Sequence, residues 1–208
     1  MVDKKAHWQN LYREKAPTDV SWHQSEPKLS LQLIHRSGIE REEALIDVGG
    51  GASLLVDYLC REGFINLAVL DISGHALAFA KQRLGGLAEG IEWYEADITE
   101  FIPPHTFSLW HDRAVFHFLT DKSDRVKYIK ALNLTLRPGG HLIIAAFAIG
   151  GPEKCSGLDI VQYDALKIAA ELGEGYVLVE QRDDLHITPA SKQQQFTYYH
   201  FVRAESGE

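Results

Sequence analysis

The stretch with the clearest chemical meaning is a carboxylate followed by three consecutive glycines, in residues 47–51, DVGGG. It follows the apolar run 44–46, which is typical of a buried strand, and precedes apolar residues at helical spacing in 54–59. Glycines at such a turn permit positive φ and let a bound molecule approach the backbone closely. The sequence therefore predicts a strand, a tight turn and a helix that bind a ligand, with Asp47 facing the site.

The spacing of these glycines argues against two common nucleotide-binding loops. The dinucleotide fingerprint places glycine at its first, third and sixth positions. Counted from Gly49, the third residue is Gly51 but the sixth is Leu54, whose side chain would crowd a pyrophosphate. A phosphate-binding loop of the Walker type is also excluded, because no Gly-Lys-Ser/Thr follows. The predicted ligand lacks a pyrophosphate.

Further carboxylates follow the next two apolar runs. Residues 64–70 read as a buried strand that leads into Asp71, and residues 91–95 read as a half-buried strand shortly before Asp97. An acid about 20 residues beyond the glycine turn, at the end of the second strand, suits the two hydroxyls of a ribose. Asp71 is therefore the candidate for binding a ribose.

Four pieces occur in order: IDVGGGAS, VLDIS, YEADI and LRPGGHLII. Together they resemble the class I S-adenosylmethionine-dependent methyltransferases, and the resemblance covers roughly residues 44–147. It implies an α/β, Rossmann-like, doubly wound sheet of seven strands. The sheet is expected to be mostly parallel, with one antiparallel strand near the edge and helices on both faces.

The resemblance also implies S-adenosylmethionine as the cofactor. It places Asp47 near the sulfonium and amino-acid portion, and Asp71 at the ribose. It further implies that the N-terminal segments fold over the site as a lid, with Trp22 as a cofactor contact; simple packing of Trp22 against the core is an equally open interpretation. The full set of predicted cofactor-binding residues is Trp22, Asp47, Gly49, Gly50, Gly51, Asp71, Ile72, Asp97 and Ile98.

A chain of 208 residues predicts one domain, 1–208. We divide it into an N-terminal helical lid segment (1–40), a cofactor-binding core (41–150), and substrate-side loops with a terminal hairpin (151–208). A formal net charge of −8 argues against a general nucleic-acid binder. No apolar run approaches the roughly 20 residues of a membrane span. With no signal peptide and only two cysteines, the sequence predicts a cytoplasmic location, no disulfide framework and no metal site.

Periodicity and breakers predict the order of the elements. The expected helices are 4–15, 27–36, 54–59, 74–84, 124–136 and 163–172. The expected strands are 44–46, 64–70, 91–95, 107–110, 141–147, 176–181 and 195–202.

The second chemically rich stretch, HDRAVFHF, follows the predicted strand 107–110. Residues just beyond a strand's carboxyl end line the crevice of an open α/β sheet. The catalytic candidates are therefore His111, Asp112, Arg113 and His117. The structural alternatives are an ion pair of Asp112 with Arg113 and a buried, hydrogen-bonded His117.

The later loops contribute candidate substrate residues. His186, like His111 and His117, is a candidate base because histidine titrates near neutral pH. Cys155 is a candidate ligand for a soft acceptor such as a metalloid, although a lone loop cysteine is more often incidental.

The predicted function is methyl transfer to a small-molecule acceptor by direct in-line displacement. The aromatic residues Trp22, Trp110, Phe116 and Phe118 suit a small or planar acceptor, and HDRA replaces the Asn-Pro-Pro-Tyr motif of nucleic-acid amino-methylating members. The alternatives are a protein lysine methyltransferase, a catalytically silent cofactor-binding protein and, least favoured, a nicotinamide oxidoreductase.

Overall fold

A computed structural model describes residues 3–205. The helices are α1 (Lys4–Glu14), α2 (Lys28–Ser37), α3 (Leu55–Arg61), α4 (Gly74–Leu84), α5 (Lys122–Thr135) and α6 (Ala165–Leu172), with short 3-10 turns η1 (Gly85–Gly90) and η2 (Phe116–Phe118). The strands are β1 (Leu45–Val48), β2 (Leu67–Asp71), β3 (Ile91–Glu95), β4 (Phe107–Arg113), β5 (Leu136–Phe147), β6 (Lys154–Cys155), β7 (Leu158–Asp159), β8 (Tyr176–Ile187) and β9 (Gln193–Arg203).

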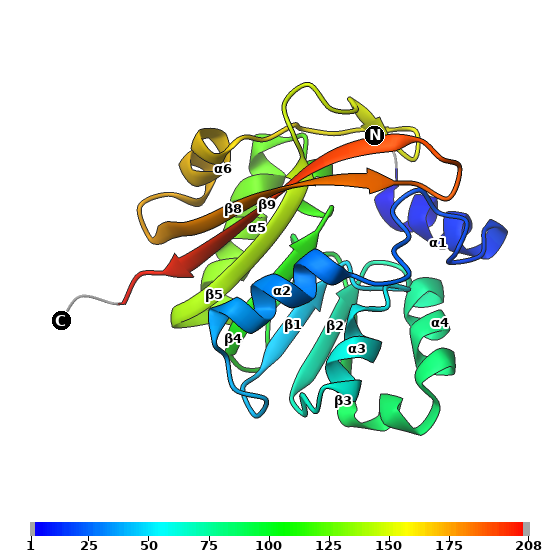
Figure 1. Cartoon of the computed structure of the whole chain (residues 1–208), viewed down its shortest axis with the longest axis horizontal. Coiled ribbons are helices and arrows are strands. Elements are labelled where there is room, and N and C mark those ends of the chain that lie inside the picture. The colour runs from blue at the N-terminus through cyan, green and yellow to red at the C-terminus, as the bar shows by residue number, and fades with distance from the viewer. Residues whose placement is uncertain (1–2, 206–208) are drawn as a thin grey trace.

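Seven of the strands form one twisted sheet in the order β3-β2-β1-β4-β5-β9-β8 (Figure 1). The pairs among β1 to β5 are parallel, whereas β9 runs antiparallel to both β5 and β8. The predicted fold is confirmed, including the antiparallel strand next to the edge. The strand order reverses between β1 and β4, and in open α/β sheets a ligand binds beyond the carboxyl ends of the strands at such a point.

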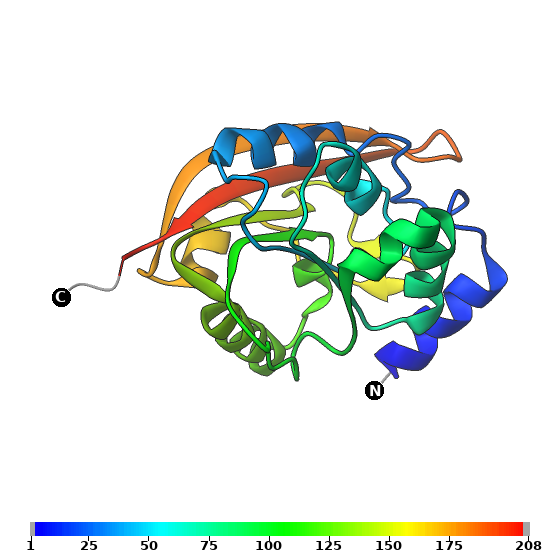
Figure 2. The ribbon, with the colours of Figure 1, turned by 90° about the horizontal axis from the view of Figure 1, so that it is seen from below.

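Helices cover both faces of the sheet, as Figure 2 shows from below. Apolar residues of α2, α3 and α4 pack with one set of strand side chains, and those of α5 and α6 pack with the other. Because side chains alternate between faces along a strand, Leu109 belongs to the first cluster and Trp110 to the second. This alternation decides which of the residues after Trp110 reach the pocket.

Several strands are longer than predicted. β4 continues through Arg113, which pairs with Ala145 of β5, so the HDR residues end a strand instead of following it. β8 continues to Ile187, which pairs with Gln193 in a hairpin with β9. β8 is an edge strand whose side chains are mostly exposed, and its second half, 182–187, is mainly polar, so it carries no apolar run that periodicity could detect.

Two connections also differ from the prediction. β5 begins at Leu136, directly after α5, and continues through Pro138-Gly139-Gly140, which was predicted only to end the helix. The loop expected at 148–158 contains the small β6–β7 hairpin. No helix among residues 3–205 is both long and apolar enough to cross a membrane.

Candidate active site

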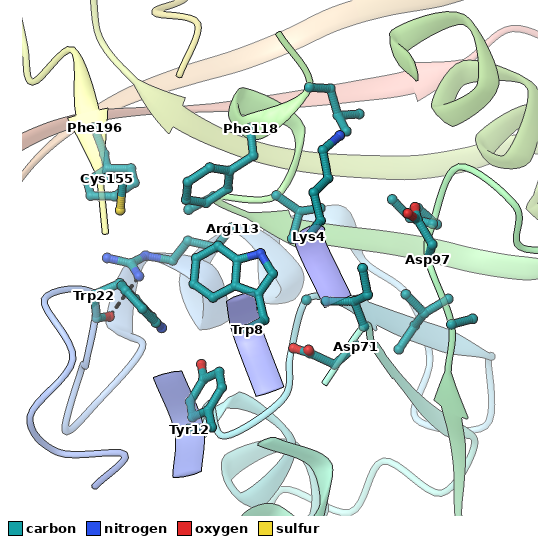
Figure 3. A pocket seen from close by; sticks show the side chains of 18 residues that line it. Lys4, Trp8, Tyr12, Trp22, Asp71, Asp97, Arg113, Phe118, Cys155 and Phe196 are labelled. Carbon is teal, nitrogen blue, oxygen red and sulfur yellow. Dashed lines mark hydrogen bonds between the residues drawn. The ribbon is translucent and has the colours of Figure 1, made fainter. Parts of the chain in front are cut away.

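A large pocket lies at the carboxyl edge of the sheet, and Figure 3 shows it from close by. Its lining residues come from α1, the segment after it, the ends of β1 to β4, the β6 turn and β9. They are Lys4, Trp8, Tyr12, Trp22, Gly49, Leu70, Asp71, Ile72, Ala96, Asp97, Ile98, Arg113, Ala114, Val115, Phe118, Leu119, Cys155 and Phe196. A second, smaller pocket, here the glycine pocket, adjoins it through Tyr12, Trp22, Gly49 and Arg113, and also contains Asp47, Gly50 and His111.

The glycine turn needs its glycines for two reasons. Gly49 and Gly51 have φ of 70° and 23°, values that residues with a Cβ rarely adopt. A Cβ at Gly51 would also collide with Asp71 Oδ2, and one at Gly49 would collide with the side chain of Val115. The turn therefore passes close to Asp71 and leaves its own backbone open to the pocket.

Asp71 ends β2 and is almost fully buried, yet it lines the large pocket. One carboxylate oxygen, Oδ1, accepts a hydrogen bond from the Ser73 backbone N–H at 2.8 Å. Burial, with a further contribution from the nearby charge of Asp47, raises the pKa of Asp71 to about 7, although the Ser73 N–H opposes the shift. A ligand that donates hydrogen bonds to this carboxylate would stabilise its ionised form.

Asp47 lies on the same face of the sheet as His111 of β4. Its Oδ1 is 2.6 Å from His111 Nδ1, and His111 Nε2 is 2.9 Å from Ser30 Oγ of α2. The other oxygen, Oδ2, is buried and has no hydrogen-bond partner in the part of the chain that the structure describes. A buried carboxylate oxygen is costly to leave unpaired, so this atom marks a place where a ligand donor fits.

Asp97 is the third carboxylate at the carboxyl edge of the sheet. Its Oδ1 accepts from the backbone N–H and the hydroxyl of Thr99, both at 2.8 Å, and this fixes the turn after β3. Ile98 and Ile72 lie beside it as apolar walls of the large pocket. The acids after β2 and β3 therefore line one end of a single pocket, as the sequence predicted.

Helix α1 packs over the pocket and contributes Lys4, Trp8 and Tyr12 to its lining. Gln9 Oε1 accepts hydrogen bonds from Ser73 Oγ and His75 N at 3.1 Å, which ties α1 to the start of α4. On the pocket side, the Trp8 ring meets Trp22 and Phe118 edge to face, at centroid distances of 5.6 and 5.1 Å. The resemblance implied a lid of N-terminal segments over the site, but it did not single out Trp8.

Comparison with known proteins agrees with this geometry. Residues 46–144 match a family model described as a methyltransferase domain. The matched domain and the sheet topology are those of a class I S-adenosylmethionine-dependent methyltransferase. S-adenosylmethionine is its cofactor, in place of the nicotinamide alternative.

Individual relatives of the methyltransferase are distant. It is 23% identical over 159 residues to EEF1A lysine methyltransferase 2 of Danio rerio, with 68% of this chain and 67% of the relative covered. The N-methyltransferase NodS of Bradyrhizobium japonicum in complex with S-adenosylhomocysteine matches at 20% identity and TM-score 0.70, over 95% of this chain and 98% of NodS. An S-adenosylmethionine-dependent methyltransferase of Anabaena variabilis matches at 15% identity and TM-score 0.76, over 98% of this chain and 96% of the Anabaena protein.

The pocket of the methyltransferase fits this cofactor. The orphan Oδ2 of Asp47 can accept from an ammonium group, and the ionised carboxylate of Asp71 can accept from two vicinal hydroxyls. Trp22 lines both pockets and also packs against the core, so both interpretations of this residue have a structural basis. Residues 3–205 contain no group of three His, Cys, Asp or Glu side chains placed to hold a metal ion.

The residues predicted for acceptor chemistry do not all lie in the same place. Arg113 and Cys155 line the large pocket, and His111 lines the glycine pocket. Asp112 differs from its prediction: it points to the opposite face of the sheet, where its carboxylate accepts from the N–H groups of Val115 and Phe116 and from Tyr128. The physical reason is that successive side chains of a strand point to opposite faces of the sheet, so Asp112 and Arg113 lie on different faces.

The other two histidines also lie outside both pockets. His117 is fully buried, its Nδ1 accepts from the Phe147 N–H at 3.4 Å, and burial followed by the charge of Arg113 lowers its pKa to about 3. His186 Nε2 lies 2.7 Å from the Ser21 carbonyl oxygen, in β8 and not in a loop. Trp110 and Phe116, expected around the acceptor, lie in the core on the α5 side.

The raised pKa of Asp71 makes cofactor binding depend on pH. Above about pH 7 the free carboxylate is already ionised, whereas at pH 6 it must release a proton to accept the ribose hydroxyls. Affinity should therefore fall by up to about tenfold per unit as the pH drops below 7. Titration calorimetry with S-adenosylhomocysteine at pH 6, in two buffers of different ionisation enthalpy, should detect the released proton. Heats that do not depend on the buffer would contradict this assignment.

Proposed function

We propose that this methyltransferase acts on a small-molecule acceptor bound in the large pocket. One observation carries the proposal: the aromatic end of the pocket is roofed by α1 and the segment after it, through Trp8 and Trp22. An acceptor at that end is in contact with aromatic rings and shielded from water. Small planar molecules bury most of their surface in such a site.

The proposed contacts to the cofactor lie at the acidic end of the pocket. Asp71 would hold the ribose hydroxyls, Asp97 and Ile98 the adenine, and Asp47 the amino-acid portion. The backbone at Gly49–Gly51 would give close contact, with Ile72 as an apolar wall and Trp22 covering the site. The cofactor supplies an electrophilic sulfonium methyl. The protein's part is to hold the acceptor atom in line with it at near-attack distance.

A second candidate acceptor is a protein lysine, and the distant relationship to EEF1A lysine methyltransferase 2 favours it. A lysine side chain would have to enter from the surface and lose a proton. Among the residues that line the large pocket there is no histidine to take that proton. This is the reason to place the small-molecule acceptor first.

The test is a radiolabelled methyl-transfer screen with the purified chain. The acceptors are thiols, metalloids, small acids and amines in one arm and cell-extract proteins in the other. We expect label in a small-molecule product. Label found only in protein bands, with none in any small-molecule fraction, would favour the lysine alternative and contradict the proposal.

Cys155 provides a further test of the acceptor's chemistry. Its thiol lines the large pocket, and burial raises its pKa to about 11, so it stays protonated at neutral pH. For an oxygen or nitrogen acceptor, Cys155→Ser should change kcat/KM by less than about fivefold, because the thiolate is absent. For a metalloid acceptor, it should be the most damaging change in the pocket. Steady-state kinetics on the acceptor found by the screen distinguishes the two.

A further inference from the structure

Arg113 is a cation at the aromatic end of the pocket without a charged partner. Its Nε donates to Tyr198 Oη at 2.8 Å, and its Nη1 donates to the Trp22 carbonyl oxygen at 2.9 Å (Figure 3). Its Nη2 is buried and has no hydrogen-bond partner within residues 3–205. None of the ion pairs formed within residues 3–205 includes this guanidinium.

The groups around Arg113 are neutral. Burial keeps the Cys155 thiol protonated, and burial together with the Arg113 charge lowers the pKa values of His117 and His186. The guanidinium carbon also lies 4.6 Å from the centroid of the Phe196 ring. The positive charge is therefore held in place by neutral hydrogen-bond acceptors and an aromatic ring, and no carboxylate of residues 3–205 forms an ion pair with it.

Such an arrangement is costly unless an anion completes it. A buried charge without a counter-charge loses hydration that neutral hydrogen bonds replace only in part. The planar guanidinium matches a carboxylate, which can accept from two of its N–H groups at once. The free Nη2 group is thus the expected contact point for a carboxylate that enters the pocket.

We propose that Arg113 selects the methyl acceptor by binding its carboxylate, so that the acceptor is a small aromatic or conjugated carboxylic acid. This inference rests on the proposed small-molecule function. Trp8, Trp22, Phe118 and Phe196 form the walls against which the apolar part of such an acid packs.

The position of Arg113 separates it from the acidic end. Figure 3 shows its guanidinium on the side of Trp22, Cys155 and Phe196, whereas Asp71 and Asp97 lie on the opposite side. Its hydrogen bond to Tyr198 of β9 holds it there. Because Arg113 also borders the glycine pocket, the cofactor's own carboxylate is the competing partner, and the experiment must distinguish the two.

The large pocket offers no histidine as a base, which agrees with an acidic acceptor. None of its lining residues is a histidine, and His111, the nearest candidate, is engaged with Asp47 and Ser30. A carboxylic acid has a pKa near 4 and is ionised at pH 7 without help from the protein. An acceptor of this class therefore needs only the positive charge that Arg113 supplies.

The experiment measures binding by ligand-observed NMR to protein saturated with S-adenosylhomocysteine. The probes are benzoate and cinnamate, each compared with its neutral amide. We expect the carboxylates to bind the wild type at least tenfold more tightly than the amides. Arg113→Gln should abolish this difference, and Arg113→Lys, which keeps the charge, should restore part of it. Arg137→Gln is the matched control, because Arg137 is exposed at the opposite end of the sheet.

The affinity for S-adenosylhomocysteine is measured on the same variants by calorimetry. We expect it to change by less than about threefold in Arg113→Gln. A loss of tenfold or more would assign Arg113 to the cofactor's carboxylate and overturn the proposal. Equal binding of carboxylates and amides to the wild type would also overturn it. This experiment measures only the binding of the probes. A failure of the proposed small-molecule function would instead be seen in the methyl-transfer screen, so the two outcomes are distinguishable.

Discussion

Replacing Asp71 with asparagine should lower the affinity for S-adenosylmethionine and S-adenosylhomocysteine by about ten- to hundredfold. The carboxylate lines the pocket, and only one of its hydrogen bonds, from the Ser73 N–H, is made within the protein. Because asparagine keeps one acceptor oxygen, the variant would lose about one charge-assisted bond, worth roughly 1.5–3 kcal/mol. Calorimetry with both ligands measures the change, and an unchanged dissociation constant would show that the acid binds something else.

Glu95→Gln is the matched control for Asp71→Asn. Glu95 pairs with Asp71 across the β2–β3 ladder and carries the same charge, but it lies at the surface against Lys5 and lines neither pocket. An exposed ion pair of this kind contributes about 0–1 kcal/mol, so the affinity should change by less than about threefold.

The free Asp71→Asn protein should be at least as stable as the wild type at pH 8. The folded-state pKa of Asp71 lies near 7, above its unfolded value of 3.8. The ionised carboxylate is therefore disfavoured by folding, and stability is lost as the pH rises from about 4 to 7. A neutral amide removes that loss. A fall in melting temperature would mean that the weakened binding reflects partial unfolding.

Asp112→Ala should destabilise the protein by about 3–5 kcal/mol, a large part of the stability of a typical domain. The carboxylate is fully buried and accepts from Val115 N, Phe116 N and Tyr128 Oη at 2.8, 3.1 and 2.6 Å. Each donor left unpaired costs about 1–3 kcal/mol. Urea unfolding monitored by circular dichroism measures the effect.

Two comparisons make the Asp112 prediction specific. Asp112→Asn keeps one acceptor oxygen and should lose less, whereas Asp159→Ala removes a carboxylate that is largely exposed and should change the free energy of unfolding by less than about 1 kcal/mol. If Asp112 contacted the acceptor, as the sequence suggested, Asp112→Ala would instead be stable and inactive. That outcome would contradict the structural function proposed for it.

The sequence by itself determined the acidic end of the pocket. The glycine turn, Asp71 after β2 and Asp97 after β3 are each defined within a few residues of a strand end. Parallel strands bring those ends to one edge, so local pattern and strand order were sufficient. The fold class was implied by the resemblance to class I methyltransferases, and the apolar runs agreed with it because buried parallel strands read as such runs.

Only the tertiary structure decided the acceptor end. The adjacent residues Asp112 and Arg113 look equally catalytic in the sequence, but the strand sends one into the core and the other into the pocket. Which of the two alternating sets of strand side chains faces the pocket depends on the helices that pack on each face of the sheet. The periodicity of the sequence does not reveal this. Trp8, Cys155 and Phe196 are far apart along the chain, and they meet Arg113 only because α1 folds back and β9 pairs antiparallel with β5.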